Sequence, residues 1–169
     1  MTEVYIALGS NLGDRLKNLI SAVDYLKDIG MIQALGGLYR SDAYGFTEQP
    51  DFYNSVVSLK TSLAPVILLD RLKEIERKLG RKKGVRWGPR EIDLDIIFYG
   101  QLILNRRELI IPHPDFHNRK FVLMPLVDIA ENFISPTHRK SVLMLLKACR
   151  DTTRTDLIAK KWYINGIKI

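Results

Sequence analysis

The sequence predicts an α+β fold, a ferredoxin-like α/β sandwich with a mostly antiparallel sheet and extra C-terminal helices. Three observations predict this class. Short apolar runs alternate with segments of helical periodicity, their order is β-α-β-β-α-β, and two further helical patterns follow the last strand. A chain of 169 residues is long enough for one compact core and too short for two comfortable ones. We therefore expect one domain over residues 1–169, in which the residues after about 150 form a tail with no assigned role.

The first three elements are expected to be a strand, a helix and a strand. Residues 4–8 form an apolar run that ends at Gly9, which is typical of a buried strand entering a turn. Asp14 stands at the expected N-cap of a helix, because apolar residues recur at helical spacing over residues 16–26. Residues 32–39 are interpreted as a second strand, although they contain two adjacent glycines.

The middle of the chain predicts a long loop, a strand, a helix and another strand. Residues 40–51 are polar and hold a glycine and a proline, which favours a loop. Residues 52–60 are rich in β-forming residues. Pro65 favours a helix start, and one apolar face continues to Leu79. Residues 92–99 then predict a strand.

The C-terminal third is less regular. Residues 109–114 are expected to be extended, and residues 121–129 and 142–148 have apolar patterns suited to short helices. The stretch from Arg150 onward has no clear pattern, and we interpret residues 162–164 as an edge strand.

Composition restricts the class of partner. The formal net charge of +7 favours an anionic partner such as a nucleotide, a phosphorylated metabolite or a nucleic acid. Cys149 is the only cysteine, which excludes a disulfide within the chain and a zinc-thiolate cluster. No apolar stretch approaches the ~18 residues of a membrane span, and no secretory leader is recognisable. We therefore expect a soluble, cytoplasmic protein.

Asp93 and Asp95 are the strongest local signal for chemistry. On a strand, residues two apart point to the same face, about 6.5 to 7 Å apart along the chain. Two like charges in this position repel each other unless a cation lies between them. Oxygen ligands favour magnesium, which usually also binds substrate phosphates. The pair therefore predicts a magnesium site, whereas an isolated Asp-x-Asp would equally suit a solvated strand face.

A basic loop stands directly before this strand and changes that balance. Its five cations, Arg81, Lys82, Lys83, Arg86 and Arg90, lie among three glycines and beside Trp87. A polyphosphate needs a metal and several cationic donors, because its charge is spread over many oxygens. The combination predicts phosphate chemistry.

Two other classes of protein remain open from these residues. A nucleotidyl-transfer palm also has paired aspartates on a ferredoxin-like sheet, and a basic ferredoxin-like module can bind single-stranded RNA. The second class needs aromatic residues interleaved with basic ones on the central strands. Two common nucleotide motifs are absent from the sequence, the P-loop ending Gly-Lys-Ser/Thr and the Gly-x-Gly-x-x-Gly fingerprint.

Several motifs resemble one enzyme family. The run Trp87-Gly-Pro-Arg90-Glu-Ile-Asp93-Leu-Asp95-Ile-Ile resembles the signature of 6-hydroxymethyl-7,8-dihydropterin pyrophosphokinases. The resemblance extends to residues 5–14, 49–54, 111–113 and 118–121, which come in the family's order. It covers most of the chain up to about residue 136.

The resemblance implies an activity and a set of site residues. It implies transfer of pyrophosphate from ATP to the hydroxymethyl group of the pterin, with release of AMP, in folate biosynthesis. It implies two magnesium ions held by Asp93 and Asp95, and catalysis by Arg81, Arg90 and Asp95. The implied nucleotide-binding residues are Glu76, Arg86, Trp87, Arg90, His113 and Arg119. The implied pterin-binding residues are Ser41, Asp42, Tyr44, Phe52, Asn54 and Phe121.

The residues themselves are compatible with these roles. A flat, polar heterocycle is bound well by aromatic faces with amide groups around its edge. Two flanking prolines stiffen the backbone of His113 and aim its ring. We expect a monomer that acts on the two small-molecule substrates and binds neither nucleic acid nor a membrane.

Overall fold

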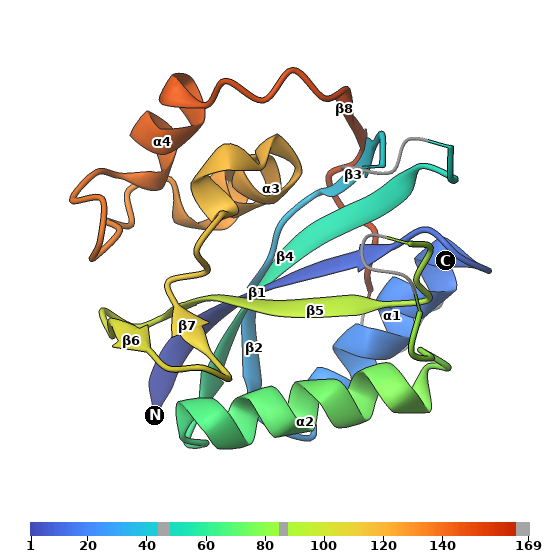
Figure 1. Cartoon of the computed structure of the whole chain (residues 1–169), viewed down its shortest axis with the longest axis horizontal. Helices are drawn as coiled ribbons and strands as arrows, with labels where there is room; N and C mark the ends of the chain where they lie inside the picture. Colours follow the sequence, from blue (N-terminus) through green and yellow to red (C-terminus); the bar gives the residue numbers. More distant parts are fainter. Residues whose placement is uncertain (44–47, 85–87, 165–169) are drawn as a thin grey trace.

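Figure 1 shows the computed structural model of the chain, in which a sheet lies between two layers of helices. The structure describes residues 1–43, 48–84 and 88–164. The elements in chain order are β1 (Thr2–Ser10), α1 (Arg15–Leu26), β2 (Met31–Leu35), β3 (Leu38–Ser41), β4 (Phe52–Thr61), α2 (Pro65–Lys78), β5 (Asp93–Tyr99), β6 (Leu104–Asn105), β7 (Ile110–Ile111), the 3-10 helix η1 (Phe116–Asn118), α3 (Lys120–Ala130), α4 (Val142–Ala148) and β8 (Thr155–Ala159).

Local sequence sets where the main helices begin. The carboxylate of Asp14 accepts a hydrogen bond from the backbone N–H of Lys17 at 3.0 Å, so it caps α1 as the sequence predicts. Pro65 occupies the first turn of α2, where a missing N–H costs nothing. Each helix then buries one apolar stripe against the sheet, which includes Leu19 and Val23 in α1.

The main sheet has the strand order β5-β1-β4-β3-β8, and β2 also pairs with β4. The paired strands run antiparallel, as in the pairing of Gly9 with Asn54 between β1 and β4. The chain order up to β5 is βαβββαβ, one strand more than the predicted βαββαβ. The antiparallel pairing and the mixture of helices and strands confirm the predicted α+β class with a mostly antiparallel sheet.

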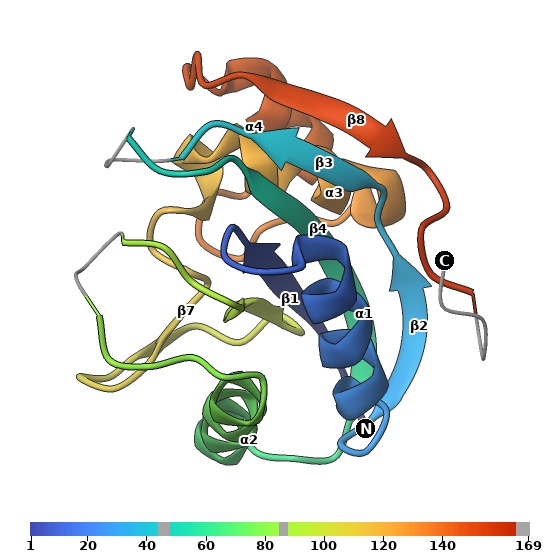
Figure 2. The same cartoon turned by 90° about the vertical axis from the view of Figure 1, so that its right-hand side faces the viewer.

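Side chains of β1 point alternately to the two faces of the sheet, and each face has its own core. Val4, Ile6 and Leu8 pack in one core with α1 and α2, whereas Tyr5 packs in the other with α3 and α4. Figures 1 and 2 show α1 and α2 on one face of the sheet and α3 and α4 on the opposite face. The extra C-terminal helices therefore cover the face that a two-layer sandwich would leave exposed.

The structure divides the predicted strand at residues 32–39 into β2 and β3. The break falls at Gly36, where a Cβ atom would lie only 2.5 Å from the backbone oxygen of Pro125 in α3. The chain therefore needs glycine at this position, because α3 approaches the backbone directly.

The predicted edge strand at residues 162–164 is wrong. The edge strand is β8, which lies earlier in the chain and pairs with β3. Trp162 is only 3% exposed, and its indole N–H donates to the carbonyl of Gly36 at 2.8 Å. The large apolar ring is a core residue that ties the C-terminal segment to the β2–β3 break.

No helix within the described residues is long and apolar enough to cross a membrane.

Candidate active site

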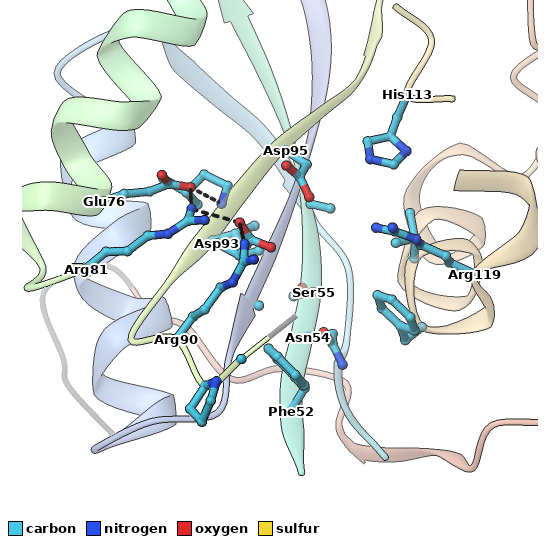
Figure 3. A pocket seen from close by; sticks show the side chains of 18 of the residues that line it. Phe52, Asn54, Ser55, Glu76, Arg81, Arg90, Asp93, Asp95, His113 and Arg119 are labelled. Atoms are coloured by element: carbon cyan, nitrogen blue, oxygen red, sulfur yellow. Dashed lines mark hydrogen bonds and ion pairs between the residues drawn. The ribbon is translucent and has the colours of Figure 1, made fainter. Parts of the chain in front are cut away.

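One cavity of about 860 Å³ brings together residues from β1, β3, β4, α2, β5 and the start of α3. Every predicted site residue that the structure describes lines this cavity: Ser41, Asp42, Phe52, Asn54, Glu76, Arg81, Arg90, Asp93, Asp95, His113, Arg119 and Phe121. The predictions for Tyr44, Arg86 and Trp87 fall outside the described residues. Figure 3 shows the labelled side chains converging on the cavity from both sides of β5.

The carboxylates of Asp93 and Asp95 share one face of β5. Their neighbours Leu94 and Ile96 point the other way, into the core beneath α1 and α2. Beyond them Ile97 is an extra residue in the pairing with β1, because Tyr5 pairs with Phe98 and the next residue pairs with Ile96. This bulge ends the polar stretch of β5 and begins its fully buried part.

Asp93 is the centre of a charge network. Nη1 of Arg81 lies 3.0 Å from Oδ1 of Asp93 and 2.6 Å from Oε1 of Glu76. Nη1 of Arg90 lies 3.3 Å from the same Asp93 oxygen, and Figure 3 shows both arginines reaching it. Two arginines, one at each end of the basic loop, therefore pair with the same carboxylate, Asp93.

Glu76 anchors this network from α2. It is 8% exposed, and its Oε1 accepts a hydrogen bond from the backbone N–H of Leu94 at 2.9 Å. Burial raises the pKa of Glu76, and the Leu94 N–H and the Arg81 charge act against that rise. An ionised Glu76 thus depends on Arg81, which couples α2 to the basic loop.

Asp95 lies deeper in the cavity, between the Asp93 network and the side chains of His113 and Arg119 (Figure 3). Burial and, to a smaller extent, the negative charge of Asp93 raise the pKa of Asp95 to about 7. An additional cation at this pair would favour the ionised form. Two carboxylates facing open space are a donor set that suits magnesium. Within the described ranges, no group of three or more acidic, histidine or cysteine side chains is placed to hold a metal ion.

His113 is a neutral donor rather than a cation. Burial and, to a smaller extent, the charge of Arg119 lower its pKa to about 4. Its Nδ1 accepts a hydrogen bond from the backbone N–H of Asp115 at 3.1 Å, which leaves the ring proton on Nε2. Its own backbone N–H donates to the carbonyl of the bulged Ile97 at 3.0 Å, so the bulge fixes where the ring stands. The side chain of Arg119 is held by Asp115 at 3.1 Å.

The other end of the cavity lies at β3 and β4. Asn54 is 4% exposed, and its Nδ2 donates to Oγ of Ser41 at 2.7 Å. Gly9 pairs with Asn54 across the sheet, and a Cβ there would lie 3.2 Å from Oδ1 of Asn54 and 3.6 Å from the Phe52 ring. The glycine leaves room for both side chains. Phe52, Asn54 and Phe121 all line the cavity.

Sequence reasoning missed three polar residues of the site. Lys73 and Arg77 line the cavity from α2, three residues before and one residue after Glu76. Lys73 lies one turn before Glu76, and Arg77 lies one turn after Lys73, so these spacings of three and four are the signal that would have found them once Glu76 was assigned to the site. Asn11 is 2% exposed, accepts from the backbone N–H of Arg90 at 2.8 Å and donates to the carbonyl of Pro50 at 3.0 Å. It joins the end of the basic loop to the segment before β4.

Comparison with known proteins identifies the family of the chain that forms this cavity. The model of the 7,8-dihydro-6-hydroxymethylpterin-pyrophosphokinase (HPPK) family matches residues 5–131. The chain belongs to the HPPK family. The match confirms the resemblance carried by the motifs, and it includes every predicted site residue.

Relatives cover most of the HPPK chain. The 2-amino-4-hydroxy-6-hydroxymethyldihydropteridine pyrophosphokinase of Aquifex aeolicus is 41% identical, and the match covers 83% of this chain and 88% of the relative. The folic acid synthesis protein fol1 of Pneumocystis carinii is 46% identical over 82% of this chain, which corresponds to only 19% of that longer protein. The crystal structure of wild-type HPPK-DHPS of Plasmodium falciparum superimposes with a TM-score of 0.67 at 15% identity, over 87% of this chain and 44% of the other. The last comparison supports the fold alone.

Proposed function

We propose that the chain transfers the β,γ-pyrophosphoryl unit of ATP to the hydroxymethyl group of 6-hydroxymethyl-7,8-dihydropterin, in folate biosynthesis. The hydroxymethyl oxygen attacks the β-phosphorus, the bond from that phosphorus to the α-phosphate oxygen breaks, and AMP leaves with that oxygen. One observation carries the proposal. A single cavity in a member of the HPPK family holds an acidic pair with several cations at one end and aromatic and amide side chains at the other.

The nucleotide occupies the end between α2 and β5 in this proposal. Lys73, Arg77, Arg81 and Arg90 come from α2 and the loop before β5, so several cations face a polyphosphate there. Arg119 points toward the cavity from the opposite side, at the N-cap of α3 (Figure 3). Arg81 and Arg90 pair with Asp93 in the free protein. Phosphate oxygens can replace the carboxylate as their partner, because guanidinium groups bind both kinds of oxygen in the same forked geometry.

Magnesium fits the same end. Asp93 and Asp95 would hold the ions, and the remaining ligands would be phosphate oxygens and water. When bound, the metal supplies positive charge that neutralises the phosphates. The number of magnesium ions, two, and their binding together with ATP are part of the proposal. The protein itself places the carboxylates on one face of β5 and keeps the neutral His113 as a hydrogen-bond donor beside them.

The pterin occupies the end between β3 and β4. Phe52 and Phe121 offer aromatic faces for a flat ring, and Asn54 and Ser41 offer polar groups for its edge. Asp95 is our candidate for accepting the hydroxyl proton, because it stands in the same cavity between the two ends. Holding the two substrates in line accounts for much of the expected rate gain.

The experiment is a product assay with ATP labelled separately at the β and γ positions. Both labels should move together onto the pterin, and AMP should be the nucleotide product. ADP with only the γ label on the pterin would show an ordinary kinase. Incorporation of nucleotide with release of pyrophosphate would show the nucleotidyl-transfer alternative. A monomeric state and a cytoplasmic location are further parts of the proposal, and light scattering after size-exclusion chromatography tests the first.

A further inference from the structure

The C-terminal segment beyond residue 131 lies outside the family match, yet its strand β8 pairs with β3, which contributes Ser41 to the cavity wall. β8 pairs antiparallel with β3, with Thr155 opposite Ser41 and Asp156 opposite Arg40. Ser41 lines the cavity and accepts a hydrogen bond from Asn54. The segment around Arg154 therefore lies directly behind the pterin end of the site (Figure 2 shows β8 along β3).

Arg154 makes an unusual number of contacts with carboxylates. Its Nη2 lies 2.9 Å from Oδ1 of Asp42 and 2.8 Å from Oδ2 of Asp51, and its Nε lies 3.8 Å from Oδ2 of Asp156. Its backbone carbonyl also accepts the N–H of Asp42 at 3.2 Å. Arg40 is the second cation of the cluster, with Nη2 3.8 Å from Oδ2 of Asp156. Without Arg154, three carboxylates would face one remaining cation.

The two aspartates that Arg154 joins are the ends of one connection. Asp42 follows Ser41 at the end of β3, and Asp51 precedes Phe52 at the start of β4. Ser41 and Phe52 are paired across these strands and both line the cavity. A change in the separation of Asp42 and Asp51 would therefore be transmitted to the two residues beside them.

A second arginine holds the same end of β4 from the other side. Nη1 of Arg15 donates to the carbonyl of Asp51 at 2.8 Å, and its guanidinium lies 4.0 Å from the centre of the Tyr53 ring. With its backbone held by Arg15 and its carboxylate by Arg154, Asp51 has little freedom to move. A single exposed ion pair contributes little, but several charges that form a network can fix a geometry.

We propose that Arg154 is a positioning residue for the pterin, which acts by clamping Asp42 to Asp51 and thereby setting the spacing of Ser41 and Phe52. This inference rests on the proposed function for its substrate. The side chain of Arg154 is 49% exposed, so salt screens the clamp. Pterin affinity, more than ATP affinity at the opposite end, should therefore depend on this one C-terminal arginine.

The test compares Arg154→Gln with Arg150→Gln. The control removes the same charge from the same segment, and Arg150 makes no ion pair with any residue that the structure describes. Arg154→Gln should raise the KM for the pterin about threefold to tenfold, with kcat and the KM for ATP changed less than about twofold. Arg150→Gln should behave as wild type. An unchanged pterin KM, or equal increases for both substrates, would overturn the proposal.

Two further measurements keep the clamp testable if Arg154→Gln is poorly folded. Arg154→Lys keeps the charge but replaces the planar guanidinium, whose Nη2 bridges Asp42 and Asp51, so its pterin KM should fall between those of wild type and Arg154→Gln. When the KCl concentration increases from about 0.05 M to about 0.5 M, the pterin KM of wild type should rise more steeply than that of Arg154→Lys. A lysine variant identical to wild type in both respects would exclude a clamp that depends on the guanidinium group.

Hydrogen exchange separates this inference from the proposed function, because it needs no turnover. The amides of Asp42 and Phe52 in the substrate-free protein should exchange faster in Arg154→Gln than in Arg150→Gln. If wild type forms no AMP with the pterin, the proposed function fails while the exchange result still decides the clamp. If wild type is active and neither exchange nor pterin KM changes, only the clamp is wrong.

Discussion

The two ends of the cavity are held in different ways. At the α2–β5 end, Arg81 and Arg90 neutralise Asp93, so the free protein satisfies its charges with one another. At the β3–β4 end, Asn54 and Ser41 are buried, hydrogen-bonded and fixed by strand pairing. In the proposed reaction, the first end exchanges partners when phosphates bind, whereas the second end is already formed before its ligand binds. The difference suits a highly charged substrate on one side and a flat, weakly charged one on the other.

The largest effect is expected from substitutions in the acidic pair, at the end proposed for the nucleotide. Asp93→Asn or Asp95→Asn should lower kcat by about 10³-fold or more, because metal charge neutralisation is worth several kcal/mol. Pterin binding measured by calorimetry should persist in the same variants, since the β3–β4 end is untouched. Asp70→Asn on the exposed side of α2 is the matched control. Near-normal turnover at saturating magnesium would contradict the assignment.

The next effect belongs to the pterin end. Asn54→Ala leaves Ser41 and the ring edge without a partner, which typically costs about 1 to 3 kcal/mol, or about 5-fold to 150-fold in the dissociation constant. Calorimetry with the pterin measures the loss, and a titration with an ATP analogue should give a wild-type constant. Equal weakening of both ligands would show that the two ends are not separate.

A smaller effect concerns the cations that sequence reasoning missed. Replacing Lys73 and Arg77 together by Gln should raise the KM for ATP about threefold to tenfold, because each is one of several charges that face the phosphates. The pterin KM should stay constant. Arg71→Gln is the control, since Arg71 lies on α2 but pairs with Glu74 away from the cavity. An ATP KM unaffected by the double change would remove α2 from the phosphate site.

The smallest effect is a titration. With a pKa of about 4, His113 should stay neutral from pH 8 down to pH 5, and its nitrogen NMR shifts should show the proton on Nε2 throughout that range. The pKa of His113 in the folded protein lies below the unfolded value of about 6.5, so the unfolded chain binds the proton first. The free energy of unfolding should therefore decrease as the pH falls from about 6.5 to about 4. His113→Gln should weaken this dependence. A ring that titrates near pH 6.5 would contradict the buried, neutral histidine.

The charged residues of the site could be predicted because their signals are local. A spacing of two on a strand puts Asp93 and Asp95 on one face whatever the rest of the fold does. Lys73 and Arg77 were missed because only the apolar stripe of α2 was read, and the polar side that faces the cavity depends on tertiary packing. Asn11 was missed as a linker for the same reason, since its partners lie far away in sequence. The roles assigned to these residues stay predictions until the variants are measured.

The C-terminal part of the fold could not be predicted, because its structure depends on distant pairing. β8 carries no clear alternation, with Leu157 and Ile158 adjacent and both exposed. Its partner β3 precedes it by more than half of the chain. Trp162 looked like an edge-strand residue because aromatic residues favour strands, but burial against Gly36 decided its place. The prediction that residues 1–169 form one domain was made from the length of the chain, and it stays a prediction.

The hydrogen bond from Trp162 to Gly36 joins residues 126 positions apart. During synthesis, β8 and Trp162 leave the ribosome long after β3 and Gly36, to which they are hydrogen-bonded. Strand β5, which carries the acidic pair, can already be paired with β1, and β1 with β4, while the edge of β3 still lacks its neighbour β8. Late pairing of distant strands is slow, because loop closure must precede the contacts that reward it. In a nascent chain, the strands of the α2–β5 end should therefore pair first, and the β3 edge of the other end should be completed only after β8 has emerged.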